Sequence, residues 1–479
     1  MTIKPIHPTA LPSGLPENAT VRLLLVAYHF PPSVSIGALR WEKLTRYLAS
    51  SGYEIDVLTL DPLALDKKDP TRLSRLPNGI RVFAIPSTRS VVERVWNTLS
   101  VVTRRFRSAG PVGHRSPGAS TESDHHTDSP RSRVLGARAS INARLHVANE
   151  LAWAKKAARL GNLLAQSRRY LAVITSGPPH YSHVSGNLIS RRSRVPHLVD
   201  FRDPWSLAES IPRDMDSPIW ASLASRYEAR VVNQATSVIM NTEAAAVEMR
   251  ALYPAIASRV ISVMNGSDPE DIVQSPLRDR FTVLYAGSLY LQRDPRAIFR
   301  ACAPIVKEFA LSPAQFAIEF LGPSSSFEGI SVLEIAESFG LRAHVSVAGQ
   351  VSRSDAIARA AAAALLVCLP DGQRLTIQAK LFEYVQLDAW LLVFADRKSA
   401  MSQALDGFDV DVVPPSDVQL AIDSVRARWL QFASGIRPLA IGRNGEFSRE
   451  AQAERIRQVL ENLAAPVVDQ QSRSQSSES

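Results

Sequence analysis

Residues 21–60 read VRLLLVAYHFPPSVSIGALRWEKLTRYLASSGYEIDVLTL, and this stretch decides the fold. Residues 23–27 form a short apolar run, which predicts a buried parallel strand. Pro31 and Pro32 interrupt regular structure. A helix is expected from about Ala38 to the glycine at position 52, and residues 55–60 predict a second strand. Strand, small-residue loop, helix and strand together indicate the opening unit of a doubly wound α/β domain.

Gly37 stands directly before the expected helix. A glycine there lets a ligand approach bare backbone, and the free N–H groups and helix dipole favour an anion such as phosphate. The alternative is that Gly37 only makes a tight turn. The stretch contains neither G-x-G-x-x-G nor G-x-x-x-x-G-K-[ST], which argues against a nicotinamide-dependent dehydrogenase and a P-loop NTPase.

Length and cysteine usage bound the class of protein. A chain of 479 residues predicts two to three domains. Its two cysteines, Cys302 and Cys368, lie in apolar segments and are too few for a disulfide framework or a metal cluster. The first twenty residues lack a continuous apolar core, and no segment approaches the roughly 20 apolar residues that span a bilayer. These features lead us to expect a cytoplasmic protein.

The net charge of +9 suits nucleic acid, an anionic membrane surface or phosphorylated ligands. No zinc-finger or RNP signature is present, so nucleic acid is not expected as a partner. Residues 89–107 mix basic and apolar side chains and predict either an amphipathic helix on a membrane or partner, or an ordinary surface helix. Residues 108–140 are of low complexity and predict a disordered insertion, and residues 1–20 and 465–479 predict disordered tails.

Strands and helices alternate along the rest of the chain, and the pattern restarts at residues 281–285, a strand followed by Gly287 and Ser288. We therefore expect two doubly wound Rossmann-like domains facing a cleft, residues 21–268 and 269–440, followed by a terminal helix at 441–464 that packs back across them. Ligands of such sheets bind at the carboxyl ends of the strands.

Five segments in order carry a resemblance: YHFPPSVSIGALRWEKLTRYL (28–48), DFRDPW (200–205), MNGSD (264–268), LYAGSLYLQRDP (284–295) and AKLFEY (379–384). Together they resemble bacterial glycosyltransferases of retaining family 4, which have the GT-B fold, in the branch with DFRDPW and KLFEY motifs. The resemblance implies transfer of a sugar from a nucleoside diphosphate sugar to an acceptor hydroxyl with retention of configuration, in cell-surface polysaccharide or glycolipid synthesis.

The resemblance also assigns residues. The donor would lie on the C-terminal domain and the acceptor, a saccharide or lipid-linked sugar, on the N-terminal domain. Glu383, near the start of its helix, would bind the ribose hydroxyls, and Arg293 and Lys380 would stabilise the charge that grows on the leaving diphosphate. Each could instead be an ordinary solvated charge. The further donor-binding candidates are Gly37, Gly287, Ser288, Thr376 and Ile377.

Two acceptor-side candidates, Arg202 and Asp203, could contact acceptor or phosphate, or could pair with each other. His180 is a catalytic candidate near the position of a family histidine, although it could be a helix-entry residue. Leu375 departs from the family, which often has a glutamate there. No metal-ligand cluster is visible, so neither a metal nor another cofactor is expected.

Two rival functions stay open. One is a non-catalytic GT-B-like binding or assembly protein. The other is a sugar-nucleotide epimerase of the same fold, which would need carboxylates acting at C2 of the sugar. A peripheral site at the inner face of the cell membrane is an option that the basic charge suggests.

Overall fold

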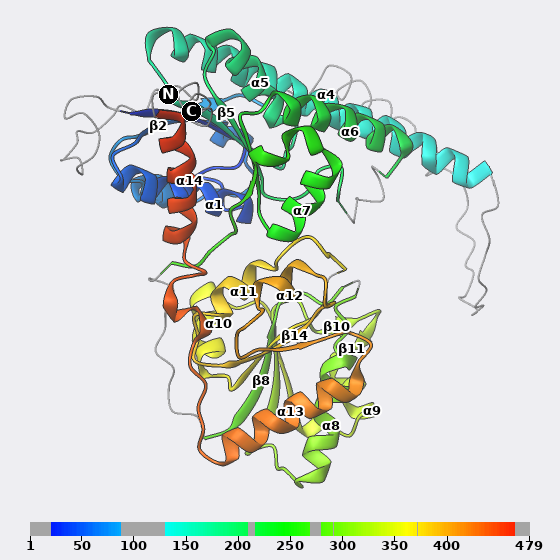
Figure 1. Cartoon of the computed structure of the whole chain (residues 1–479). Coiled ribbons are helices and arrows are strands. Elements are labelled where there is room, and N and C mark those ends of the chain that lie inside the picture. Colours follow the sequence, from blue (N-terminus) through cyan, green and yellow to red (C-terminus); the bar gives the residue numbers. More distant parts are fainter. Residues whose placement is uncertain are drawn as a thin grey trace, which may run out of the picture. The chain divides into compact units, whose positions relative to one another are not determined.

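The structure, a computed structural model, describes residues 21–87, 130–208, 216–268, 279–290, 292–370 and 372–464, with the side chains of Ile36 and of residues 130–138 left out. The expected tails, the segment 89–107 and residues 108–129 of the expected insertion lie outside the described residues. Contacts divide the chain into two units, Met1–Ile239 with Leu460–Ser479, and Met240–Val459 (Figure 1).

The first sheet has seven strands in the order β3-β2-β1-β4-β5-β6-β7. The pairings of β1 with β2 and β4, of β2 with β3, and of β4 with β5 are parallel. The apolar run predicted as the first strand is confirmed as the central strand β1, buried along nearly its whole length because helices cover both faces of such a sheet. The strands are β1 (Arg22–Ala27), β2 (Glu54–Leu60), β3 (Ile80–Ile85), β4 (Ala172–Gly177), β5 (His197–Phe201), β6 (Ser237–Met240) and β7 (Val260–Ser262).

Helices α4, α5 and α6 form a layer along this sheet (Figure 1). Trp153 and Ala157 of α4 and Ile189 of α5 pack with Leu24 and Val173 of the central strands in one apolar cluster. Helix α4 begins at Pro130, so residues 130–140, which were expected to belong to a disordered insertion, are helical. The helices from Ile36 to Leu252 are α1 (Ile36–Ser50), α2 (Thr71–Ser74), α4 (Pro130–Ser167), α5 (Ser182–Ser193), α6 (Pro218–Gln234) and α7 (Glu243–Leu252).

The second sheet has six parallel strands in the order β12-β9-β8-β13-β14-β15, with a separate antiparallel pair, β10 and β11. The predicted restart at residues 281–285 is confirmed, since β8 begins at Phe281 and lies in the middle of this sheet. The strands are β8 (Phe281–Ala286), β9 (Phe316–Leu321), β10 (Ser326–Phe327), β11 (Ile330–Ser331), β12 (Val345–Ala348), β13 (Leu365–Cys368), β14 (Trp390–Phe394) and β15 (Asp411–Val413).

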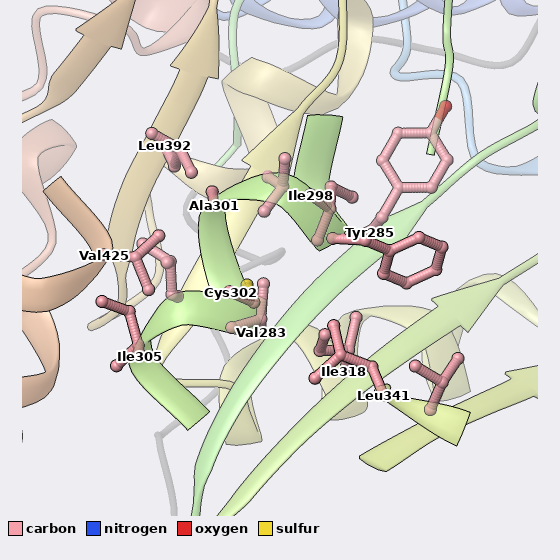
Figure 2. Close-up of a cluster of buried hydrophobic side chains, with 14 of the residues drawn as sticks. Val283, Tyr285, Ile298, Ala301, Cys302, Ile305, Ile318, Leu341, Leu392 and Val425 are labelled. Atoms are coloured by element: carbon pink, nitrogen blue, oxygen red, sulfur yellow. The ribbon is translucent and has the colours of Figure 1, made fainter. Parts of the chain in front are cut away.

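Figure 2 shows the core between this sheet and its helices, where Cys302 and Ile305 of α8 meet Val283 of β8, Leu392 of β14 and Val425 of α13. Helices α8 and α13 lie side by side (Figure 1). The helices are α8 (Arg296–Glu308), α9 (Val332–Ser338), α10 (Arg353–Ala362), α11 (Ala379–Tyr384), α12 (Ala400–Ala404), α13 (Val418–Ala433) and α14 (Arg449–Ala464).

Both cysteines are free and buried, as expected, and burial raises the pKa of the Cys302 thiol. Of the helices that the structure describes, none combines the length and the apolar character that a membrane crossing requires.

Candidate functional site

A buried carboxylate organises the carboxyl end of the first sheet. Asp200, in β5, is fully buried and accepts hydrogen bonds from Arg40 Nη2 at 2.8 Å, Trp41 Nε1 at 2.7 Å and Ser176 Oγ at 3.0 Å. These bonds tie α1 to the ends of β4 and β5. Arg40 is only 5% exposed, because the buried Asp200 requires a cationic partner.

Arg202 lies against the start of α1. Its backbone N–H and Nε donate to the carbonyl of Gly177 at 3.0 and 3.2 Å, and Nη2 donates to the carbonyl of Pro178. A Cβ added at Gly37 would overlap the Arg202 guanidinium. Burial lowers the pKa of Arg202, with the neighbouring Arg40 adding to the effect. Position 37 therefore needs glycine so that this buried cation can pack on the first turn of α1. Asp203, the next residue, is exposed.

His180 follows β4, as expected, and stacks on Trp205 with ring centroids 5.2 Å apart and 17° between the planes. Burial, reinforced by the charge of Arg202, lowers its pKa to about 3, so the ring is neutral at pH 7. His29, just after β1, behaves similarly: burial and then Arg202 lower its pKa to about 4. Sequence reasoning missed His29, although a polar residue at the carboxyl end of the first strand is a usable signal.

Four of the predicted donor-site residues gather around Tyr285 of β8. Lys380 Nζ lies 4.0 Å from the centre of the Tyr285 ring and donates to the Ala286 carbonyl at 3.0 Å. Arg293 forms a side-chain hydrogen bond with Tyr285 and lies over the ring of Tyr290. We call Tyr285, Gly287, Ser288, Arg293 and Lys380 the Tyr285 cluster. It places two cations at the carboxyl end of the central strand of the second sheet.

Gly287 and Ser288 complete this cluster. Gly287 has a φ of +146°, which disfavours other residues, and an added Cβ would come within 3.2 Å of Lys380 Nζ. Its N–H donates to the Leu321 carbonyl at 2.8 Å, so it is not available to a ligand. The Ser288 carbonyl accepts from the Tyr285 hydroxyl at 2.9 Å. Both residues thus make a backbone hydrogen bond within the chain, and Gly287 in addition offers close approach because it has no side chain. Sequence reasoning did not identify Tyr285 itself.

Glu383 lies near the end of α11, not near its start, because the helix runs only from Ala379 to Tyr384. Its Oε1 accepts from Arg353 Nη2 at 2.8 Å and Nε at 3.1 Å. Thr376 and Ile377 precede the helix and are half-buried and buried. Leu375 is 2% exposed, and its carbonyl accepts from the Thr242 hydroxyl at 2.7 Å. Glu383 is therefore in an ion pair that a ligand would have to share or displace.

In the described ranges, no group of three His, Cys, Asp or Glu is arranged to hold a metal ion.

A comparison with protein families matches residues 37–266 to the family described as "Glycosyl transferase 4-like domain". No curated protein sequence matches the chain. Solved structures do match. A sucrose-phosphate synthase from Thermosynechococcus elongatus is 14% identical with a TM-score of 0.56, over 92% of this chain and 99% of that one.

Two further structures match over the same shares, 92% of this chain and 99% of theirs. They are Anabaena HepE in complex with UDP and glucose, at 15% identity and a TM-score of 0.53, and the lipopolysaccharide outer core galactosyltransferase WaaB, at 13% and 0.54. At these identities the likeness concerns the fold. The predicted fold class is confirmed: the chain has the GT-B arrangement of two parallel-sheet α/β domains.

Proposed function

We propose that this chain is a glycosyltransferase that moves a sugar from a nucleoside diphosphate sugar to an acceptor hydroxyl with retention of configuration. We place the reaction in cell-surface polysaccharide or glycolipid synthesis. The observation that carries the proposal is the Tyr285 cluster, which holds Lys380 and Arg293 at the carboxyl end of β8. The family match at residues 37–266 and the GT-B fold support it.

On the donor side, Lys380 and Arg293 would face the diphosphate. Negative charge grows on this leaving group as the glycosidic bond breaks, and fixed cations lower the barrier because they need no reorganisation. Gly287 lets the phosphates come close to the backbone, and Ser288 would donate hydrogen bonds to them. The structure of HepE is a complex with UDP and glucose, which supports the same class of donor here.

The ribose would bind Glu383, whose carboxylate is an acceptor for both hydroxyls. Thr376 and Ile377 would contact the donor from the segment before α11. This role requires the ribose to share or replace the contact with Arg353.

On the acceptor side, Arg202, Asp203 and His180 belong to the first unit, as does the donor-binding candidate Gly37. A histidine with a pKa of about 3 is a weak base at pH 7, so His180 would contact the sugar as a neutral ring. We propose that the departing phosphate accepts the proton of the acceptor hydroxyl and that Asp203 orients this hydroxyl. The transition state would be oxocarbenium-like.

No metal is required in this scheme, because Lys380 and Arg293 supply the positive charge at the diphosphate. Transfer should then persist in EDTA, and loss of activity that Mg²⁺ restores would contradict this part of the proposal. We further propose a cytoplasmic protein that contacts anionic membrane through its basic surface. Sedimentation with vesicles containing phosphatidylglycerol tests this, and absence of co-sedimentation at low salt would contradict it.

Thermal unfolding with UDP-, GDP-, ADP- and dTDP-sugars tests the donor site. A ligand at a hundred times its dissociation constant adds about 2.7 kcal/mol to the stability of the folded state. We expect one nucleotide class to raise the melting temperature, Lys380→Met to abolish the rise, and Lys307→Met, an exposed lysine on α8, to keep it. No rise with any nucleotide would contradict the proposal.

A non-catalytic binding protein is the second candidate, and one observation favours it. Leu375 is buried and apolar at the position where the resemblance implies a sugar-binding carboxylate. Such a protein would show the same nucleotide-dependent stabilisation but would neither transfer nor hydrolyse the sugar. Release of nucleoside diphosphate over time, with and without bacterial lipid extract as acceptor, separates the two candidates.

A further inference from the structure

A pocket of about 150 Å³ lies in the second unit where β13 and β14 end. The lining residues that matter here come from three loops, from the end of β14 and from α12. They are Gln292, Arg374, Gln378, Phe394, Asp396 and Met401.

The Gln378 side chain is the strongest sign of a ligand. It is 7% exposed, and its Nε2 donates to the Leu369 carbonyl at 2.6 Å. Its Oε1 is buried and has no hydrogen-bond partner in the part of the chain that the structure describes. Buried acceptors normally have a hydrogen-bond partner, so we expect this oxygen to accept a hydrogen bond from an O–H or N–H group of a ligand in the pocket.

The other polar groups define the chemistry of that donor. Asp396 follows β14 and presents an exposed carboxylate, a second acceptor. Arg374 is already paired, with Nη2 3.0 Å from Glu248 Oε1, so its charge is compensated. A ligand with several hydroxyl groups and no negative charge suits this lining, since an anion would meet the Asp396 carboxylate. Phe394 and Met401 add an apolar surface, which matches the C–H face of a sugar ring.

The chain connects this pocket to the Tyr285 cluster at two points. Gln292 directly precedes Arg293, and Gln378 lies two residues before Lys380. A molecule whose diphosphate lies at Arg293 and Lys380 would therefore have its next group beside the pocket.

We propose that this pocket binds the sugar moiety of the donor and selects an uncharged hexose over a uronic acid, with Gln378 and Asp396 accepting hydrogen bonds from its hydroxyls. This inference rests on the proposed function and adds the class of sugar. Binding is a matter of hydrogen bonds and packing, and no bond is made or broken at the pocket.

Isothermal titration tests the inference with four pairs of probes: UDP and UDP-glucose, GDP and GDP-mannose, ADP and ADP-glucose, and dTDP and dTDP-rhamnose. The pair that the wild-type protein binds is then titrated into Asp396→Asn and Gln378→Leu. We expect each variant to bind the sugar nucleotide about tenfold more weakly, while the affinity for the bare nucleotide stays within twofold. Unchanged binding of the bare nucleotide also shows that the donor domain is folded.

Matched controls are Asp406→Asn and Gln419→Leu, exposed residues of the second unit outside the pocket, which should change neither affinity. For a chain that binds UDP, Asp396→Asn should in addition narrow the preference for UDP-glucose over UDP-glucuronate. If the variants keep the wild-type ratio of the affinity for the sugar nucleotide to the affinity for the bare nucleotide, the sugar does not bind in this pocket. The inference then fails while the proposed function stands. If the wild-type protein binds none of the eight probes, the proposed function fails and the inference with it.

Discussion

Arg40 and Asp200 form a buried ion pair, with Nη2 2.8 Å from Oδ1 and side chains 4% and 0% exposed. The two residues are 160 positions apart in the sequence. Trp41 donates to the same carboxylate. Because α1 begins and β5 ends at the proposed acceptor side, this pair fixes where Gly37 and Arg202 lie relative to each other.

Replacing Arg40 by methionine should destabilise the protein strongly. The substitution leaves Asp200 buried without its cation, and removing one partner of a buried pair typically costs about 3–5 kcal/mol. Urea unfolding followed by tryptophan fluorescence measures the loss. Arg443→Met is the control, since its pair with Asp388 is exposed and such pairs contribute about 0–1 kcal/mol. Equal stability of the two variants would show that the Arg40 pair does not hold the fold together.

Gly37→Ala should act through Arg202. The new methyl group overlaps the guanidinium, which must leave the carbonyls of Gly177 and Pro178. Unsatisfied buried acceptors cost about 1–3 kcal/mol. In an Arg202→Ala background there is no guanidinium to displace, so the same substitution should cost almost nothing. A double-mutant cycle by urea unfolding measures this coupling. Additive effects would mean that Gly37 is required only for its turn.

The strands and the presence of two α/β domains were predictable from the sequence, because buried parallel strands are short apolar runs between turn residues. The apolar runs Ile80–Ile85, Phe316–Leu321 and Val345–Ala348 form β3, β9 and β12. Helix α10 begins after Ser352, which caps it by accepting from the backbone N–H of Asp355. Local signals fixed these elements.

Contacts between distant loops were not predictable in the same way. Arg40 has the spacing of an exposed helix residue, and only the order of the strands brings Asp200 to it. Glu383 was expected near the start of its helix but lies near its end, and Gln378, the N-cap of α11, makes no side-chain capping bond that would mark the helix start in the sequence. The Tyr285 cluster was half-predictable: the motifs supplied Lys380 and Arg293, but an aromatic residue inside a strand looks like ordinary core.

Stability should fall as the pH drops from 7.5 to 5.5. The pKa values of His180 and His197 are lowered to about 3 in the folded protein, whereas an unfolded histidine titrates near 6.5. The unfolded state therefore binds more protons in this window, and the free energy of unfolding decreases by about 1.4 kcal/mol for each such histidine. Carboxylates with lowered pKa values change the free energy of unfolding only at lower pH.

His180→Phe isolates one of these contributions, because phenylalanine keeps the stacking on Trp205 and does not titrate. Its stability should fall by about 1.4 kcal/mol less than that of the wild type between pH 7.5 and 5.5. Between pH 9 and 7.5 the two curves should run parallel. Identical pH dependence of the two proteins across the acid window would show that His180 is protonated in the folded state as readily as in the unfolded one.

Arg353 should compete with the donor for Glu383. The two side chains are 55% and 35% exposed, and an ion pair of this kind contributes at most about 1 kcal/mol. Arg353→Ala frees the carboxylate and should tighten binding of the preferred nucleoside diphosphate about two- to fivefold. Glu383→Gln keeps the size but removes the charge and should weaken binding at least tenfold. Titration calorimetry at 50 and 300 mM NaCl measures the affinity of both variants and of the wild type. Raising the salt concentration should reduce the advantage of Arg353→Ala over the wild type, because salt screens the competing ion pair. Weaker binding in Arg353→Ala would reverse the interpretation and make Arg353 a direct ligand of the nucleotide.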